Sequence, residues 1–458
     1  MADVAGKKCV VVGLGVSGLS AALFLHERGA QVGVSDARPA LALDPAALAV
    51  LREVNIPVET GGHTHTFFHG AHLVVPSPGV PLELEVIVRA REQGAEVAGE
   101  LALAAGLFDA PVIAVTGSNG KTTVTSLIAH LLREDQRTVF LGGNIGVPLL
   151  DYLRGEEKAD VLVLELSSFQ LEMSGSFRPD IGLLLNLSPD HIDRHGSMEN
   201  YAAAKLRIFA NQRETDIAII GGDDPLLKPE RLPGKGRVAQ FGSSAAMDAR
   251  VEEGRVLLSG AATGTGADEW YDVAGTPMDS RVNRLNAAAA VLGVRLFGCA
   301  PASVRSGLAA FKPPPHRMAL VAEIEGVRYV NDSKGTNVGA TAAALESCAG
   351  EVVLIAGGRD KASDFSLLAD KVARRVREMV LIGEAADRIE KSLGSLVPVH
   401  RAFSMKEAVR IAAGVARPGD TVLLSPACAS FDMFNGYAER GEAFEKAVRE
   451  LLKVGHHC

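Results

Sequence analysis

The sequence contains no uncharged apolar run long enough to cross a membrane, and it does not begin with the charged-then-apolar pattern of a secretory leader. Cysteine is also scarce. The five cysteines are odd in number, scattered and free of C-x-x-C spacing, which argues against a disulfide framework and against a thiolate zinc site. These absences indicate a cytoplasmic protein that does not insert into a membrane.

Positive charge is not in excess either. The formal net charge of -8 gives no long-range attraction for nucleic acid or for an anionic membrane surface. A polyanionic ligand therefore needs local positive side chains. The composition, 47% hydrophobic and 22% charged, is that of a globular protein, and the length of 458 residues suggests about three domains.

Short apolar runs alternate with amphipathic segments along the chain, which predicts an α/β fold. We predict a Rossmann-like domain over 1–98, a central P-loop ATPase-like domain with a parallel sheet over 99–313, and a Rossmann-like domain over 314–458. The Gly-rich segment 228–280 predicts a small β-rich subregion. The stiff run KPPP at 312–315 cannot continue a helix and is the best candidate for a linker.

The stretch GLGVSGLS follows the apolar run CVVV near the N-terminus. Its Gly13, Gly15 and Gly18 form G-x-G-x-x-G, the phosphate turn of a dinucleotide-binding unit, and Asp36 closes a second strand further on. This pattern alone permits an NAD-dependent dehydrogenase.

The strongest motif is TGSNGKTT at 116–123, which lies between a predicted strand and a predicted helix. Backbone amides and the helix N-terminus can face a phosphate there, while Lys121 supplies positive charge and Thr122 supplies a hydroxyl for magnesium. The usual Walker pattern has glycine where this chain has Val115, so a generic nucleotide hydrolase is a poorer match.

Polar residues follow two further predicted strands. Glu165 ends the strand of LVLELSS, where a carboxylate beside a phosphate loop is suited to bind magnesium. In DHIDRH, His191 is the preferred candidate for metal binding or proton transfer, and His195 is interpreted as a satisfied surface group. On residue type alone, Lys205 is expected to face water from a helix.

A second group of histidines, in HTHTFFHGAH, could be taken for a metal-binding site. It contains His63, His65, His69 and His72 but no cysteine or carboxylate. We therefore interpret the segment as a polar loop before the strand of HLVVPSPG.

The motifs GSNGKTT, LELSSFQL, DHIDRH with YAAAKLRIF, HRM, NDSKGTN and SPACASFDMFNGYAERG follow one another along nearly the whole chain. In this order they resemble the motifs of the Mur ligases, which act in peptidoglycan synthesis and so in cell-wall biogenesis, cell shape and cell division, and they are most similar to those of members that add D-glutamate. The resemblance implies ATP-dependent joining of D-glutamate to UDP-N-acetylmuramoyl-L-alanine through an acyl phosphate, with release of ADP and phosphate. It also implies that the first Gly-rich turn binds the diphosphate of a nucleotide sugar. A sibling ligase for another amino acid is the alternative.

The resemblance further implies three groups of binding residues. For the UDP-sugar these are Gly15, Val16, Ser17, Asp36, Arg38, Ser77, Pro78, Gly79, Gly143, Asn144, Ser167 and His191. For ATP they are Thr116, Gly117, Ser118, Asn119, Gly120, Lys121, Thr122, Thr123, Asn283, Asn286, Arg317 and Asp332. For D-glutamate they are His316, Lys334, Thr336, Lys361, Ser430 and Tyr437. Tyr437 stands where the family usually has phenylalanine, and Val282 where a histidine is common.

Two Mg²⁺ ions are implied as cofactors, with Thr122 and Glu165 at the first and Glu165, His191 and Lys205 at the second. Because a lysine ammonium would repel a dication, the resemblance implies that Lys205 is carbamylated by carbon dioxide. Lys121, Glu165, His191 and Lys205 are then the expected catalytic residues. We expect a monomer whose partners are small-molecule substrates, with no nucleic acid among them.

Overall fold

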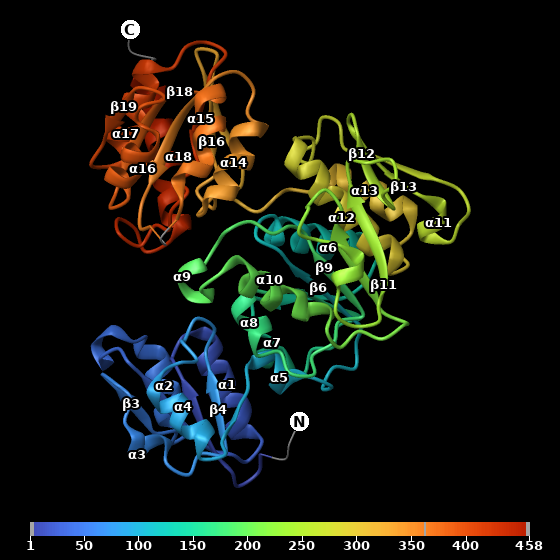
Figure 1. Ribbon diagram of the computed structural model, residues 1–458, viewed down its shortest axis with the longest axis vertical. Coiled ribbons are helices and arrows are strands. Elements are labelled where there is room, and N and C mark those ends of the chain that lie inside the picture. Colours follow the sequence, from blue (N-terminus) through green and yellow to red (C-terminus); the bar gives the residue numbers. More distant parts are fainter. Residues whose placement is uncertain (1–3, 361–362, 455–458) are drawn as a thin grey trace.

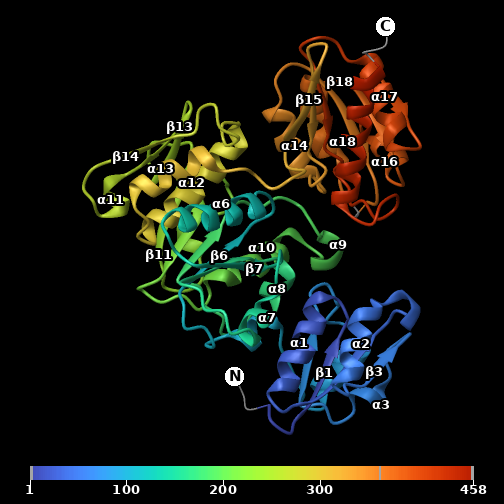
Figure 2. The same ribbon diagram turned by 180° about the vertical axis from the view of Figure 1, so that it is seen from behind.

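The computed structural model describes residues 4–360 and 363–454, and it contains three β-sheets that follow one another along the chain (Figures 1 and 2). Helices cover the sheets, so the predicted α/β fold is confirmed. The division at 98/99 and 313/314 remains our proposal for the domain boundaries. No helix in the described parts of the chain is long and apolar enough to cross a membrane.

The first sheet has five parallel strands in the order β3-β2-β1-β4-β5. Gly13 leaves β1 with a φ of +90°, and a Cβ at Gly18 would lie 2.0 Å from the Gly13 carbonyl oxygen, so this turn into α1 requires glycine at both positions. The elements are β1 (Lys8–Val12), α1 (Val16–Glu27), β2 (Gln31–Asp36), α2 (Pro45–Glu53), β3 (Val58–Thr60), α3 (His65–Phe68), β4 (Leu73–Pro76), α4 (Glu85–Glu92) and β5 (Glu96–Val97).

The second sheet has nine strands in the order β14-β13-β12-β11-β10-β9-β6-β8-β7. Its strands are β6 (Val112–Thr116), β7 (Val139–Gly143), β8 (Val161–Glu165), β9 (Ile181–Leu184), β10 (Ile217–Gly221), β11 (Arg237–Gly242), β12 (Ala249–Glu252), β13 (Arg255–Leu258) and β14 (Glu269–Asp272). Its helices are α5 (Glu100–Ala104), α6 (Lys121–Glu134), α7 (Leu149–Arg154), α8 (Ser168–Glu172), α9 (Ile192–His195), α10 (Met198–Leu206), α11 (Gly260–Thr263), α12 (Arg281–Leu296) and α13 (Pro301–Ala310).

The predictions for this second sheet need one correction. The strands from β7 to β12 pair in parallel, but β12 with β13 and β13 with β14 pair antiparallel. The β-rich segment predicted over 228–280 therefore extends the sheet and makes it mixed. The physical reason is the short connection between β12 and β13, where Gly254 has a φ of +71°, because a tight turn joins only antiparallel strands.

The third sheet has six strands in the order β15-β16-β20-β17-β18-β19, all parallel except the pair β15 and β16. Loops that follow β16, β17 and β20 emerge at the carboxyl edge of these parallel strands, the edge where α/β sheets bind ligands. The elements are β15 (Ala319–Ile324), β16 (Val327–Asn331), α14 (Val338–Ser347), β17 (Val352–Gly357), α15 (Ala369–Arg375), β18 (Val376–Ile382), α16 (Ala386–Leu393), β19 (Val399–Arg401), α17 (Met405–Val415), β20 (Thr421–Leu424) and α18 (Tyr437–Val454).

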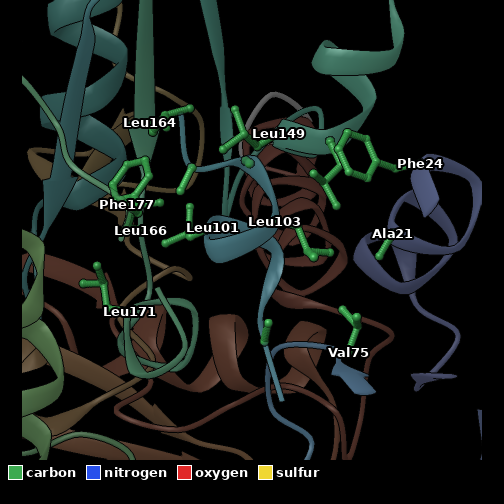
Figure 3. Packing of buried hydrophobic residues seen from close by; sticks show 14 of the residues in the cluster. Ala21, Phe24, Val75, Leu101, Leu103, Leu149, Leu164, Leu166, Leu171 and Phe177 are labelled. Atoms are coloured by element: carbon green, nitrogen blue, oxygen red, sulfur yellow. The ribbon is translucent and has the colours of Figure 1, made fainter. Parts of the chain in front are cut away.

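One hydrophobic cluster continues from the first sheet into the second. In Figure 3, Phe24 of α1 lies beside Leu149 of α7, Ala21 of α1 lies beside Leu103 of α5, and α5 also supplies Leu101 to the same cluster. Arg154 of α7 also forms a salt bridge of 2.6 Å with Glu27 of α1. The third sheet follows the 312–315 run and has hydrophobic clusters of its own. The first two sheets therefore share a hydrophobic core, and the third sheet has separate ones.

Candidate active site

A cleft of about 390 Å³ lies between the N-terminus of α6 and α14 of the third sheet. It brings together expected residues from all three predicted groups. These are Ser118, Asn119, Gly120, Lys121, Thr122, Thr123, Asn144, Glu165, Ser167, His191, Lys205, Asn283, Asn286, Arg317, Asp332, Lys334 and Thr336. Thr116 ends β6 and Gly117 begins the loop, while His316, Ser430, Tyr437 and Gly143 are not among the residues that line this cleft.

The phosphate loop has a fixed shape. The amides of Ser118 and Asn119 donate to the backbone and side-chain oxygens of Asn186, each at 2.9 Å, and Lys121 Nζ donates to the carbonyls of Gly117 (2.8 Å) and Ser118 (2.9 Å). These two amides therefore do not point at an anion here. The amides of the first turn of α6, which lack intrahelical partners, are the donors suited to a phosphate.

Asn186 was missed by sequence reasoning. It follows β9, which pairs in parallel with β6, so the loops after both strands meet at one edge of the sheet. Its side chain also donates to the Asn119 carbonyl at 3.1 Å. One sequence signal could have identified Asn186. It is an amide side chain just after a buried strand, where that strand is a neighbour of the strand leading into the phosphate loop.

Two side chains from beyond the linker reach the second sheet. Arg317 Nη2 donates to Thr122 Oγ1 at 2.5 Å, and Asn337 Nδ2 donates to Asp190 Oδ2 at 3.0 Å. The hydroxyl expected to bind magnesium is thus a hydrogen-bond partner of Arg317 in this structure.

Glu165 is buried at the end of β8, with 2% of its surface exposed. Asn144 Nδ2 donates to Glu165 Oε1 at 3.1 Å, and Asn144 N donates to the Glu165 carbonyl at 2.8 Å. A Cβ at Gly143 would lie 2.4 Å from that carbonyl, so glycine is required there. Glu165 Oε2 is buried without a hydrogen-bond partner among the described residues, and a buried carboxylate oxygen of this kind is suited to a cation.

Lys205 does not face water, so the expectation from residue type is wrong. Only 2% of its surface is exposed, and its Nζ donates to the Gly117 carbonyl at 2.8 Å and to Thr116 Oγ1 at 3.4 Å. Burial, reinforced by the nearby charge of Lys121, lowers the pKa of Lys205 well below its usual value. The side chain is therefore held as a buried amine beside the phosphate loop.

The two histidines of DHIDRH differ in exposure. The imidazole of His191 lines the cleft and lies 3.7 Å from Asp190 Oδ2, with its ring centroid 4.9 Å from that of Phe169. His195 is satisfied as expected, since its Nε2 shares a hydrogen bond of 2.9 Å with Ser168 Oγ, but it is buried instead of lying at the surface. Aromatic packing against Phe169 explains that burial.

No group of three or more His, Cys, Asp or Glu side chains that could hold a metal occurs within residues 4–360 and 363–454. The prediction of a polar loop over HTHTFFHGAH needs a correction, because the segment contains the short helix α3 with Phe68 buried. Three of its histidines have separate partners: His63 shares a hydrogen bond with Ser35, His65 lies 3.5 Å from Glu85, and His72 accepts from the Lys8 amide. A cation beside Glu165 would need further donors of other types, such as the Thr122 hydroxyl.

The expected UDP-sugar residues of the first domain lie apart from the cleft, around the turn that follows β1. Asp36 is buried, and its Oδ2 accepts from the Leu14 amide at 2.7 Å while Arg38 donates to both of its oxygens. The hydrogen bonds from Arg38 lower the pKa of Asp36 to about 2. Ser77 Oγ donates to the Gly13 carbonyl at 2.8 Å. Gly15 caps α1, Val16 and Ser17 are the first residues of that helix, and Pro78 and Gly79 lie in the turn after β4; Val16 is exposed.

The expected D-glutamate residues surround the carboxyl edge of the third sheet. Lys334 Nζ lies 3.8 Å from the ring centroid of Tyr437, and Ser430 is buried in the loop after β20. Asn331 Nδ2 hydrogen-bonds to His316 Nδ1 at 2.9 Å. Lys361, the remaining member of this group, lies outside the described residues.

Asn283 and Asn286 project from α12 toward the phosphate loop. A Cβ at Gly120 would lie 2.4 Å from Asn286 Oδ1, and Asn286 Nδ2 donates to Asn283 Oδ1 at 3.2 Å. Both asparagines therefore border the phosphate-loop end of the cleft.

The buried carboxyl group of Asp332 should make the free energy of unfolding depend on pH. It is 8% exposed, and burial raises its pKa to about 7, although Ser425 Oγ donates to it at 2.8 Å. The folded protein thus binds a proton that the unfolded chain has released, so this carboxyl costs stability as pH rises from about 4 to about 7. Relative to the native protein, Asp332→Asn should gain about 3 kcal/mol of unfolding free energy between pH 5 and pH 8.

Thermal unfolding measured across that pH range tests this expectation. Asp272→Asn is the matched control, because that carboxylate is 75% exposed and its replacement should shift stability little at any pH. A stability difference for Asp332→Asn that does not change between pH 5 and pH 8 would contradict the raised pKa.

Comparison with known proteins gives consistent matches along the chain. Residues 7–99 match the family described as Mur ligase MurD-like, N-terminal domain, residues 115–292 match the Mur ligase middle domain, and residues 316–428 match the Mur ligase glutamate ligase domain. The UDP-N-acetylmuramoylalanine–D-glutamate ligase of Desulfotalea psychrophila is 48% identical over 97% of this chain and 96% of its own length. The protein of the same name from Acidobacterium capsulatum is 43% identical over 97% of both chains.

Solved structures share the fold at lower identity. A pseudomurein peptide ligase type C from Methanothermus fervidus has a TM-score of 0.60 and 19% identity, covering 96% of this chain and 100% of that one. The MurF ligase of Thermotoga maritima in complex with ADP also has a TM-score of 0.60 and 19% identity, covering 97% and 96%. At this identity the likeness concerns the arrangement of the three sheets.

Proposed function

Because this chain belongs to the Mur ligase family, we propose that it joins D-glutamate to UDP-N-acetylmuramoyl-L-alanine in peptidoglycan precursor synthesis, converting ATP to ADP and phosphate. The observation that carries the proposal is the single cleft in which the phosphate loop, the buried carboxylate of Glu165 and third-sheet residues such as Lys334 come together. An ATP-dependent ligase needs a nucleotide and an amino acid to meet at one place, and the lining of this cleft supports its assignment as that place.

The chemistry requires activation of the sugar substrate. A carboxylate and an ammonium group do not form an amide in water, because the carboxylate has no adequate leaving group. Transfer of the ATP γ-phosphoryl group to the alanine carboxylate gives an acyl phosphate and ADP. The amine of D-glutamate then attacks the acyl carbon, the tetrahedral intermediate collapses, and inorganic phosphate leaves with the amide bond formed.

Lys121 and the first turn of α6 would hold the terminal phosphates of ATP, since they offer a positive charge and backbone donors at one place. ATP, the substrate carboxylate and D-glutamate are all anionic, so they approach one another only where positive charge is concentrated. Two Mg²⁺ ions would supply further charge neutralisation at Thr122, Glu165, His191 and Lys205. The buried Oε2 of Glu165 fits that assignment.

Lys205 fits the assignment only in a modified form, and we infer carbamylation. Its amine nitrogen would add to the carbon of carbon dioxide and lose a proton, which converts a cationic side chain into an anionic oxygen donor. Only a neutral amine can react in this way, and burial favours the neutral amine at this position. The carbamate would lie beside Thr116 and Gly117, at the base of the phosphate loop.

The remaining contacts follow the placement of the residues. The turn after β1, with Gly15, Ser17 and the Asp36–Arg38 pair, would hold the uridine diphosphate, while Asn144 would hold the muramoyl-alanine end near Glu165. Residues 283 and 286 of α12 would border the adenine. We further propose a cytoplasmic monomer whose third domain closes on the 312–315 linker and excludes water from the acyl phosphate.

An amino-acid panel tests the function directly. With ATP, Mg²⁺ and UDP-N-acetylmuramoyl-L-alanine, purified protein should release phosphate with D-glutamate and form the sugar dipeptide. Phosphate release with L-lysine or diaminopimelate, when UDP-N-acetylmuramoyl-L-alanyl-D-glutamate replaces the sugar substrate, would identify a sibling ligase. Failure to form any coupled product with ADP would exclude the ligase altogether.

A further inference from the structure

Arg440 is the bulkiest of the almost completely buried side chains in the described part of the chain, with 1% of its surface exposed. It belongs to the motif SPACASFDMFNGYAERG, yet none of the roles proposed above uses it. It lies in the first turn of α18, the helix that begins at Tyr437. A long, charged side chain is rarely buried in this way unless its hydrogen bonds are satisfied.

The guanidinium of Arg440 joins two loops at the carboxyl edge of the third sheet. Its Nε donates to Ser333 Oγ at 3.0 Å and its Nη2 to the Ser333 carbonyl at 2.8 Å. Its Nη1 donates to the carbonyls of Cys428 (3.1 Å) and Ala429 (3.3 Å). The loop after β16 and the loop after β20 are therefore held at a fixed separation by one rigid, planar group.

The residues expected to bind D-glutamate are next to these contacts. Ser430 follows Ala429 directly, and Lys334 follows Ser333. Ser333 Oγ also donates to the Tyr437 carbonyl at 2.7 Å, and the Tyr437 ring lies 3.8 Å from Lys334 Nζ. A change in the guanidinium would therefore move Ser430 relative to the Lys334–Tyr437 pair.

The charge of Arg440 is also relevant. Within residues 4–360 and 363–454 it forms no salt bridge, and its partners are one hydroxyl and three carbonyl oxygens. Burial lowers its pKa to about 10, which still leaves the side chain protonated at neutral pH. Carbonyl dipoles stabilise this charge locally, and Asp332 and Asp432 lie near enough to offset part of it.

We propose that Arg440 is a positioning residue for D-glutamate. It sets the distance between Ser430 and the Lys334–Tyr437 pair without touching the amino acid. The inference rests on the function proposed above, because it concerns the amino-acid site of that reaction.

Steady-state kinetics of Arg440→Met and Arg440→Lys test the proposal. Arg440→Met should raise KM for D-glutamate by about 10- to 100-fold, because hydrogen bonds to a charged group are lost. Arg440→Lys keeps the charge but not the fork of donors, so its effect should be intermediate. KM for ATP and for the UDP-sugar should stay within about twofold, and hydroxylamine trapping should give wild-type acyl phosphate without D-glutamate.

Two further variants keep the test decisive. Ser333→Ala removes the partner of Arg440 Nε while the guanidinium remains, so it should raise KM for D-glutamate even if Arg440→Met fails to fold. Arg410→Met is the matched control, since Arg410 is an exposed arginine on α17 and its loss should change none of the three KM values.

The outcomes distinguish failure of the proposed function from failure of the positioning role of Arg440. If the wild-type protein forms no product with D-glutamate, the proposed function fails before any variant is compared. If the wild type is active but the variants leave KM for D-glutamate unchanged, the positioning role is wrong. A joint rise in all three KM values with a lower unfolding temperature also overturns it, because it would show a merely structural role.

Discussion

Lys121→Ala is expected to abolish formation of the acyl phosphate and to lower kcat by about 10³-fold, because no other side chain of the phosphate loop carries a positive charge. Lys121 Nζ donates to the carbonyls of Gly117 and Ser118 and is thus already held above the loop. The measurements are hydroxylamine trapping of the acyl phosphate and release of ADP that depends on the UDP-sugar.

Lys158→Ala is the matched control for this variant. Lys158 is an exposed lysine on the same sheet's surface loops, so its removal should leave both measurements at the wild-type level. ADP release by Lys121→Ala that still depends on the UDP-sugar would exclude the role assigned to Lys121.

The second large effect concerns Lys205. Lys205→Ala should lower activity by at least about 10²-fold, because it removes the proposed carbamate oxygen from the metal site. Short carboxylates such as formate or acetate should restore part of the activity, since the truncated side chain leaves a buried space beside Gly117 and a small anion can place an oxygen there. Phosphate release measured against carboxylate concentration gives the result.

Two comparisons make the Lys205 experiment specific. Chloride at the same ionic strength should not restore activity, and carboxylates should not restore Lys121→Ala, which lacks a cation. Full activity of Lys205→Ala without any additive would defeat the carbamate proposal, as would the absence of a ¹³C-carbamate signal from the wild-type protein supplied with labelled bicarbonate.

Much of the fold was predictable because its signals are local. The apolar run before TGSNGKTT and the helix after it correspond to β6 and α6, and the first Gly-rich turn leads from β1 into α1 as its glycine spacing indicates. Short edge strands such as β3 and β5 were not predicted, since two or three residues give no periodicity to detect. The β-rich segment over 228–280 was predicted, but no local signal showed that its strands continue the second sheet with antiparallel pairing.

From residue chemistry alone, the candidate site was predictable only where polar residues lie at strand ends, and the family motifs supplied the others, such as Asn283 and Arg317. Glu165 ends a buried strand and His191 follows another, and the structure brings both to the same cleft as the phosphate loop. The burial of Lys205 could not be predicted from residue type, because a lysine next to alanines on a helix is usually exposed to solvent. The phosphate loop that covers it comes from a distant part of the sequence. The contact of Arg317 with Thr122 spans the linker, so no local pattern encodes it.

The apolar cluster shared by α1, α5 and α7 affects which parts of the chain could be exchanged with those of a related protein. Exchanging the first hundred residues for those of another ligase would require the new helix surface to interlock with Leu101, Leu103 and Leu149, since core packing tolerates little change in shape. A chimera cut at the KPPP run would need to keep polar contacts such as those of Asn337 with Asp190 and Arg317 with Thr122. A new amino-acid specificity is therefore easier to introduce by exchanging the C-terminal third of the chain than a new nucleotide-sugar specificity is by exchanging the N-terminal third.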